Sequence, residues 1–295
     1  MELLDGSTDE STDASIDVLD RIDKTIDEAI DGIIEEAKAL RQKGLSYSEI
    51  ARILRAKGVE VSRVTVMRWC KGLHDPRNRL NSVKLDPSPE LAYVIGVMFG
   101  DGCVGFRRAG RAYRYRIRLK VVDKDFAEEF KRCLEALGLK PSLRLERDKT
   151  RCDRWCVEAN SKILYEFLKR PKEKLFEVAK KYPIEFLRGF FDSEGTVYLN
   201  PKNPRIARVR ASNYDLELLE FMKVLLLDLG IYSTIYITKK KGEQSNIRGK
   251  IYKYRKNFYI IDISRKDSVK KFAINVGFTI RRKQNKLETF LRFLQ

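Results

Sequence analysis

The sequence predicts an α+β protein in which a small all-α unit precedes a larger unit made of two similar halves. The strongest observation is an internal repeat: an apolar helical segment ends at Asp101-Gly102, and a second copy ends 93 residues later at Glu194-Gly195. Strands of alternating basic and apolar residues follow each copy, whereas residues 16–72 show only helical periodicity. We therefore divide the chain into an acidic tail and helix (1–36), a second helical region (37–73), a linker (74–89), a first half (90–182) and a second half (183–295).

Charge is unevenly distributed along the 295 residues. The net charge is +18, but residues 1–36 hold thirteen acids and two bases, so the remaining 259 residues carry +29. Such a basic body favours an anionic partner, with nucleic acid first and an anionic membrane surface second. No uncharged apolar run approaches the roughly 20 residues of a membrane-spanning helix. The acidic N-terminus resembles neither a secretory signal nor a transit peptide, so we expect a cytoplasmic or nucleoid-associated protein outside membranes.

Histidine and cysteine usage narrows the chemistry. His74 is the only histidine, which excludes most mechanisms that use histidine as a general base or as a metal ligand. Among the five cysteines, Cys152 and Cys156 are four residues apart, but no second close pair or histidine completes a zinc site. We expect free thiols in a reducing compartment.

The N-terminal segment combines low complexity with an amphipathic helix. Residues 1–15 are rich in Ser, Thr and Asp and are expected to be disordered. From Ile16 to Leu40, apolar residues recur at steps of three and four and define one stripe of a helix, whose other face is acidic. Two interpretations stay open: a solvated face on a helix that packs against the next unit, or an acidic arm that docks on the basic body or on a second chain.

A pair of short helices follows. Ser46 and Glu49 form the capping box of the first helix, and the second helix opens at Ser62. The pattern resembles the helix-turn-helix of resolvases and transposases, whose second helix enters the major groove, although the connection at 56–61 is longer than usual. We expect DNA contacts from Ser62, Arg63, Thr65 and Arg68, and core positions for Val64, Val66 and Trp69. The alternative is a packing module that does not contact DNA. Three prolines then mark the linker.

The duplicated segment carries the candidate chemistry. Each copy holds small residues four apart, Gly96 and Gly100 in the first and Gly189 and Ser193 in the second, which lie on one helix face and allow two backbones to approach closely. If the two helices pack in parallel, the acids that follow them meet at one end. Two carboxylates there repel each other and oppose the negative end of each helix dipole. A divalent cation such as magnesium resolves this conflict; the alternative is that the acids only terminate helices.

The paired motifs, Glu90–Gly102 and Ile184–Gly195, resemble the LAGLIDADG homing endonucleases in their single-chain, two-repeat form, and the similarity covers about 90–292. The resemblance implies tandem αββαββα repeats that form a DNA-binding saddle. It also implies a monomer that cleaves double-stranded DNA at specific sites with magnesium or manganese, in intron or intein homing. It assigns Asp101 and Glu194 to catalysis and metal binding and places the preceding Gly100 and Ser193 in the metal site.

The resemblance further implies a basic residue near each acid. Lys283 fits the tail of the second half and Lys124 a strand end of the first, where the second half has Asn213 and Tyr214 instead. Both lysines could instead contact phosphates.

Basic residues alternate with apolar residues along the expected strands at 114–122 and 205–211, so that one sheet face packs on helices and the other presents cations. Each strand is followed by a helix ending in Leu-Gly, at 137–138 and 229–230, then by two more strands and a helix. The segment 239–257 holds eight bases and one acid and is expected to be a long hairpin along the DNA, with a solvated basic loop as the alternative. The expected DNA-contacting residues are Arg114, Arg116, Arg118, Lys120, Arg208, Arg210, Lys239, Lys241, Arg248, Lys250, Lys253 and Arg255.

Two rival functions use the same scaffold. A non-cleaving DNA-binding regulator would join this fold to a helix-turn-helix but typically lacks the acids, which are present here. An RNA maturase would use the basic saddle to hold a folded intron RNA.

Overall fold

The fold is described from a computed structural model, in which residues 29–74, 83–109, 112–147, 152–247 and 249–294 are described. The chain forms two compact units, Met1–Ser82 and Val83–Gln295. The boundary between them falls inside the linker expected from the sequence. No helix in the described ranges is both long and apolar enough to cross a membrane.

The first unit contains a helix at 29–42, α2 (Tyr47–Ala56) and α3 (Arg63–Cys70). The capping box of α2 is formed: Ser46 Oγ accepts a hydrogen bond from the Glu49 amide, and the Glu49 carboxylate accepts one from the Ser46 amide. Apolar residues of all three helices form one core, made of Ile34, Ala37, Ile50, Ala51, Leu54, Val66 and Trp69. The all-α unit is therefore confirmed.

Val64 and the acidic helix are the two features of the first unit whose predicted packing the structure tests. Val64 was expected in the core, but its side chain is 46% exposed because it lies on the face of α3 opposite Val66 and Trp69. The described end of the acidic helix packs on α2 and α3 through Ile34 and Ala37. Residues 1–28, which include most of its expected acidic face, lie outside the described residues.

The first half of the second unit begins with α4 (Pro89–Met98), continues through strands, and ends in two helices. Its strands form one antiparallel sheet in the order β1-β2-β4-β3. The elements after α4 are β1 (Gly102–Ala109), β2 (Ala112–Val121), α5 (Lys124–Ala136), β3 (Ser142–Glu146), β4 (Arg154–Asn160), α6 (Lys162–Leu168) and α7 (Lys172–Lys181).

The second half repeats this plan from α8 (Pro183–Glu194) onward, with the sheet order β5-β6-β10-β7. The tandem αββαββα arrangement is thus confirmed, and each half carries one further helix at its end. The remaining elements are β5 (Gly195–Leu199), β6 (Ala207–Asn213), α9 (Leu216–Asp228), β7 (Thr234–Lys239), β10 (Phe258–Ile263), α10 (Lys266–Asn275) and α11 (Arg281–Arg292).

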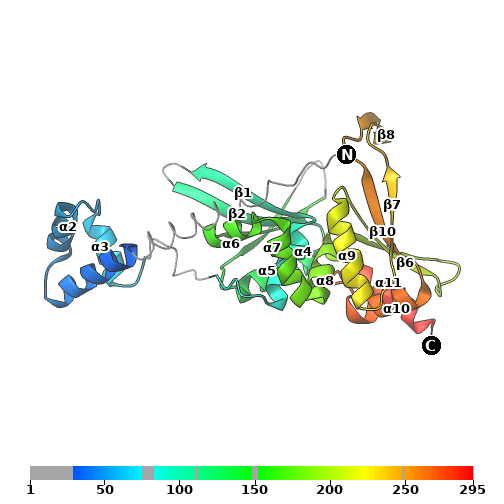
Figure 1. Cartoon of the computed structure of the whole chain (residues 1–295), viewed down its shortest axis with the longest axis horizontal. Helices are drawn as coiled ribbons and strands as arrows, with labels where there is room; N and C mark the ends of the chain where they lie inside the picture. Colours follow the sequence, from blue (N-terminus) through cyan, green and yellow to red (C-terminus); the bar gives the residue numbers. More distant parts are fainter. Residues whose placement is uncertain (1–28, 75–82, 110–111, 148–151, 248, 295) are drawn as a thin grey trace, which may run out of the picture. The chain divides into compact units, whose positions relative to one another are not determined.

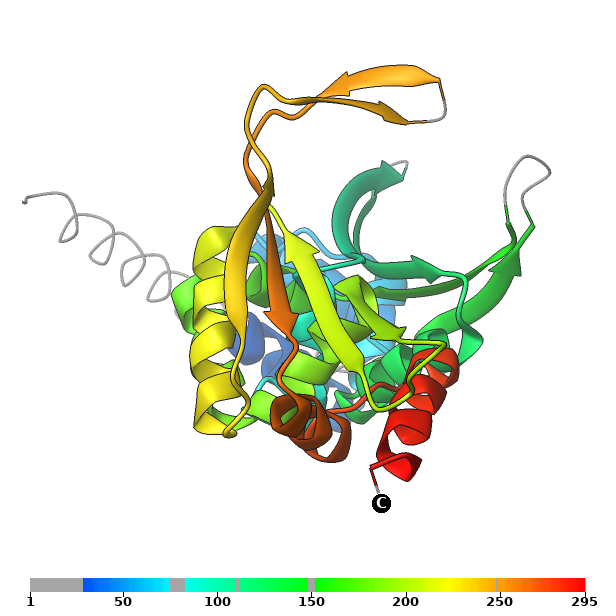
Figure 2. The same cartoon turned by 90° about the vertical axis from the view of Figure 1, so that its right-hand side faces the viewer.

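A separate hairpin is inserted between β7 and β10. It consists of β8 (Gln244–Ile247) and β9 (Lys250–Lys253), and Figure 2 shows it projecting beyond the ends of the strands that carry it. The segment expected to be a hairpin at 239–257 therefore contains one, although β8 and β9 pair only with each other and not with the four-stranded sheet.

One core joins the two halves. The apolar positions of the strands face inward, as in β6, where Ala207, Val209 and Ala211 are buried and alternate with solvent-facing arginines. Helices α4 and α8 lie side by side in the middle of this core (Figure 1). Because α4 leads directly into the first sheet and α8 into the second, their packing fixes where the two sheets start.

Candidate active site

The crossing of α4 and α8 is unusually close. A Cβ atom built on Gly96 would lie 2.1 Å from the Phe186 carbonyl oxygen, and one on Gly189 would lie 2.3 Å from the Tyr93 carbonyl oxygen. Real Cβ atoms do not approach backbone atoms this closely, so only glycine allows the two backbones to touch. The glycines thus set the distance between the helices.

The same packing brings the ends of the two helices together. A Cβ on Gly100 would lie 2.4 Å from the Ser193 Cβ and 3.1 Å from the Glu194 Cγ. Asp101 follows Gly100 directly, and Glu194 is the last residue of α8. The structure therefore places both predicted acids, with Gly100 and Ser193 between them, at one end of the helix pair.

The electrostatics of this end disfavour two negative charges. Removal from water raises the pKa of Asp101, and the positive charges of Lys283 and Arg154 partly offset this effect. Burial and then the charge of Asp101 raise the pKa of Glu194 to about 7, again with a partial offset from Lys283. Without a cation, the site therefore favours protonation of one of its two carboxyl groups near neutral pH.

Lys283 is built into the same end of α8. Its buried ammonium donates hydrogen bonds to the carbonyl oxygens of Asp192 (2.6 Å) and Phe191 (3.2 Å), which belong to the last turn of the helix. A cation there is favoured because the carbonyl groups at the C-terminal end of a helix carry partial negative charge. Burial lowers the pKa of Lys283 to about 8, and the nearby Asp192 partly opposes this shift.

A cavity of about 280 Å³ opens beside the acids. Its walls come from both halves, and they combine Asp101 and Ser193 with four cationic side chains: Lys120, Arg154, Arg282 and Lys283. Arg282 is held by two hydrogen bonds to the carboxylate of Asp123, at 2.6 and 2.8 Å. An anionic group that enters this cavity would meet the carboxylates and the cations together.

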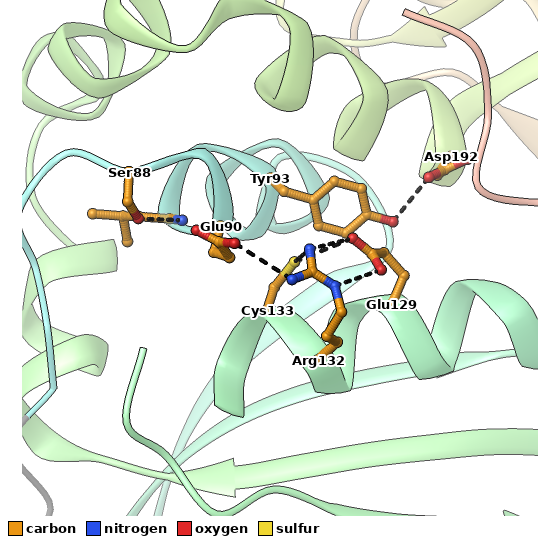
Figure 3. A network of polar contacts seen from close by, with 8 residues as sticks. Ser88, Glu90, Tyr93, Glu129, Arg132, Cys133 and Asp192 are labelled. Carbon is orange, nitrogen blue, oxygen red and sulfur yellow. Dashed lines mark hydrogen bonds and ion pairs between the residues drawn. The ribbon is translucent and has the colours of Figure 1, made fainter. Parts of the chain in front are cut away.

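Asp192 connects the parts of this region. Its buried carboxylate accepts hydrogen bonds from the Tyr93 hydroxyl of α4 (2.8 Å) and from the Thr279 amide before α11 (3.0 Å). Figure 3 shows Tyr93 reaching from α4 towards Asp192 on α8. Burial raises the pKa of Asp192 to about 6, and the bond from Tyr93 limits the shift. The side chain holds together α4, α8 and the segment that leads to Lys283.

Lys124 is not among the residues that line the cavity. It is the first residue of α5, where its ammonium pairs with Glu128 one turn later, at 2.8 Å, and lies over the Trp155 ring. Lys120, four residues earlier on β2, does line the cavity. Asn213 donates a hydrogen bond to the Phe99 carbonyl and so bridges the halves.

The carboxylates fit a hard divalent cation. Within the described ranges, no cluster of three or more His, Cys, Asp and Glu side chains could hold a metal ion. The donors at the helix ends are the carboxylates of Asp101 and Glu194, and oxygen ligands completed by water and phosphate suit magnesium or manganese rather than zinc.

The residues predicted to contact DNA lie on four surfaces: the outer faces of the two sheets, the hairpin and α3. Arg114, Arg116, Arg118 and Lys120 alternate along the outer face of β2, with Arg107 opposite Arg114 on β1. In the second sheet Arg208 is exposed, whereas Arg210 donates a hydrogen bond to Asp262 at 2.7 Å.

The hairpin and the first unit hold the others. Lys241, Lys253 and Arg255 line a hollow at the hairpin base, and Lys239 pairs with Glu243. Lys250 lies in β9, and Arg248 lies outside the described residues. On α3, Arg63 and Arg68 are exposed, while Ser62 and Thr65 hydrogen-bond each other at the helix start.

Sequence reasoning assigned no role to Asp192, Tyr93, Arg154 or Arg282. One signal was available: Asp192 occupies the place that Phe99 has in the first copy of the motif, so an acid replaces an apolar residue inside the repeat. Arg282 pairs with Asp123 of the opposite half, and the charge of Arg154 acts on Asp101. No spacing in the sequence indicates either interaction.

The fold and the site together define an internally duplicated protein in which two packed helices bring one acid each to the same end of the helix pair, next to a cavity that Asp101 and Ser193 line. Residues 88–171 and 181–277 match the LAGLIDADG-like domain, and the chain belongs to this family. An uncharacterized protein of Methanocaldococcus jannaschii is 48% identical over 260 residues, which cover 88% of this chain and 93% of that protein.

Two solved structures have a similar fold. The crystal structure of I-DmoI in complex with DNA and calcium is 21% identical, covers 68% of this chain and 97% of its own, and gives a TM-score of 0.49. Full-length WhiA from Thermatoga maritima is 18% identical, covers 73% of this chain and 63% of its own, and gives a TM-score of 0.43.

Proposed function

We propose that this protein is a site-specific endonuclease that cleaves both strands of duplex DNA with the help of magnesium or manganese. The observation that carries the proposal is the meeting of Asp101 and Glu194 at the ends of α4 and α8. Two carboxyl groups with raised pKa values, placed beside a cavity lined by four cations, have no evident structural use. They do suit a reaction on a phosphodiester.

Each part of the site has a definite task in this proposal. Asp101 and Glu194, next to Gly100 and Ser193, would hold the divalent cation. A bound cation would lower the pKa of a water molecule and stabilise the charge that develops on the phosphate oxygens. Lys120, Arg154 and Arg282 lie where they can neutralise the phosphate. Lys283 fixes the end of α8 and offsets the charge of both acids.

The outer faces of the two sheets supply the DNA-binding surface. The inner faces pack on helices, so the outer rows of cations are on the side that phosphates and base edges can approach. A single chain holds both halves and both acids, so we propose that a monomer acts on DNA. The hairpin of β8 and β9 adds basic residues at the end of the second sheet.

The first unit is proposed to be a second DNA-binding element of the helix-turn-helix kind. Its second helix, α3, presents Arg63, Val64 and Arg68 to solvent and has no acidic residue. Because Val66 and Trp69 anchor the opposite face in the core, an exposed valine between arginines fits a helix that reads the major groove.

The experiment is a cleavage selection from a plasmid library of randomised DNA, with magnesium in one arm and EDTA in the other. We expect recovery of linear plasmids cut at one sequence class in the magnesium arm only. A protein that enriches DNA by binding but never cuts would be a non-cleaving regulator. Retention of structured intron RNA with no DNA enriched in either arm would favour a maturase. Either result would overturn the proposal.

A further inference from the structure

The outer faces of the two sheets differ in chemistry although their topology is the same. In the first sheet, cross-strand partners on β1, β2, β4 and β3 place a dense set of cations on this face. The set consists of Arg107, Arg114, Arg116, Arg118, Lys120, Arg144 and Arg154. Only two acids, Glu146 and Glu158, lie among them.

The two acids hold some of these cations in place. Glu146 pairs with Lys120 at 2.7 Å and with Arg144 at 2.9 Å, and the bond from Lys120 is the main reason that the pKa of Glu146 falls to about 2. Glu158 lies between Arg144 (3.6 Å) and Arg116 (3.8 Å). A guanidinium restrained in this way loses less conformational freedom on binding and presents its donors in a fixed direction.

Arg118 lies in the middle of this face without such a partner. It is opposite Cys103 on β1 and Glu158 on β4. Within the described ranges its guanidinium group makes no hydrogen bond and no ion pair, so the donors of this side chain remain available. Arg118 is therefore the cation most suited to bind a base edge directly.

The second sheet presents hydroxyl and apolar groups in the corresponding positions. Tyr198 is 53% exposed and Tyr236 is 39% exposed, and both belong to the outer face. Two ion pairs lie on this face, Arg210 with Asp262 and Lys239 with Glu243, and the charges within each pair cancel. The uncharged side chains of this face also include Thr196, Ser212, Thr234, Phe258 and Ile260. Arg208, opposite Tyr198, is the uncompensated cation of the four-stranded face in the described ranges.

We infer that the two halves of the DNA target differ in base composition, with guanines contacted by the β1–β4 face and A·T pairs by the β5–β10 face. This inference rests on the proposed function and specifies its substrate. Arginine donates two hydrogen bonds to O6 and N7 of guanine, the pair of acceptors that this base alone presents in the major groove. Threonine methyls and the apolar surfaces of tyrosine and isoleucine instead contact the methyl group of thymine.

The test is selection of bound sequences from randomised duplex DNA, followed by affinity measurements on every single-base variant of the selected site. Wild type should select a site with guanines concentrated in one half and A·T pairs in the other. Arg118→Gln should change one position of the guanine half from G to A, because glutamine pairs with adenine. We expect the preference for G there to fall about 5- to 150-fold, the range for one lost bidentate contact.

Two further variants test which sheet face contacts which half of the DNA site. Tyr198→Ala should weaken discrimination at one or two positions of the A·T half and leave the guanine half unchanged. Arg170→Ala removes a positive charge next to α6, outside the sheet faces, and should alter neither half. Agreement of all three results supports the inference.

Two results would overturn the inference while leaving the endonuclease proposal intact: a cleaved site whose halves have equal composition, or an Arg118→Gln variant that binds all sequences equally more weakly. The second result would identify Arg118 as a phosphate contact. Failure to select or cleave any DNA would overturn both proposals together.

Discussion

The contact between α4 and α8 leads to a prediction with a calculable magnitude. In Gly96→Ala, the new methyl carbon would lie 2.1 Å from the Phe186 carbonyl oxygen and 2.9 Å from the Phe190 amide nitrogen. Since non-bonded heavy atoms rest roughly 3.5 Å apart, the helices must separate locally by about 1.4 Å. Overpacking costs about 1–3 kcal/mol, and the clash with backbone places this variant at the upper end or above.

A loss of about 3 kcal/mol corresponds to a fall in Tm of about 6–12 °C for a unit of this size. Thermal denaturation followed by circular dichroism measures it, and Gly189→Ala should behave in the same way because its methyl would meet the Tyr93 carbonyl oxygen. Gly105→Ala in β1 is the control, since no atom lies within 4 Å of the added carbon. If Gly96→Ala and Gly105→Ala melt within a degree or two of each other, the close helix contact does not exist.

Three further predictions follow from the site and its surfaces. In EDTA, Glu194→Gln should stabilise the protein at pH 8 but not at pH 4. Folding raises the pKa of Glu194 from 4.5 to about 7, so the wild-type protein loses stability as the pH rises from 4.5 to 7. The gain should be on the order of 1–3 kcal/mol by denaturant unfolding, and equal effects at both pH values would contradict it. Arg63→Ala combined with Arg68→Ala should weaken binding to a long DNA site but not to a short core duplex; equal affinities of this variant and wild type on both would remove α3 from the interface. Neutralisation of 6–10 phosphates by the basic faces should reduce affinity about 10³- to 10⁵-fold between 50 and 200 mM salt, and a nearly flat salt dependence in a filter-binding assay would argue against such a surface.

The sequence predicted the parts of the fold that repeat. Two copies of one motif, followed by alternating basic and apolar strands, predicted two similar halves, because a period of two and a period of 3.6 are both visible in the residues. The αββαββα order of each half was implied by the resemblance to the LAGLIDADG family. The core of the first unit followed from the same reasoning except at Val64. Helical spacing alone left the orientation of that residue open, and the packing of Val66 and Trp69 turned it towards solvent.

The surroundings of the acids were less accessible from sequence. Lys283 was named from a loose match to the family, but its hydrogen bonds to the end of α8 depend on how α11 returns across the core. Lys124 was named for its position after a strand, where local pairing with Glu128 engages its ammonium. Asp192 acquires its partners from α4 and from the segment before α11, 99 and 87 residues away along the chain. Such contacts are set by tertiary packing.

The most direct test of the central claim uses the DNA site recovered in the cleavage selection. Single-turnover cleavage with magnesium would be measured for wild type, Asp101→Asn, Glu194→Gln and Glu177→Gln, the last being a matched change on the exposed surface of α7. Binding of each variant to the same duplex would be measured in parallel. We predict that Asp101→Asn and Glu194→Gln lose cleavage while binding stays within a few fold, and that Glu177→Gln cuts like wild type. Undiminished cleavage by either variant of the acids at the helix ends would contradict the account.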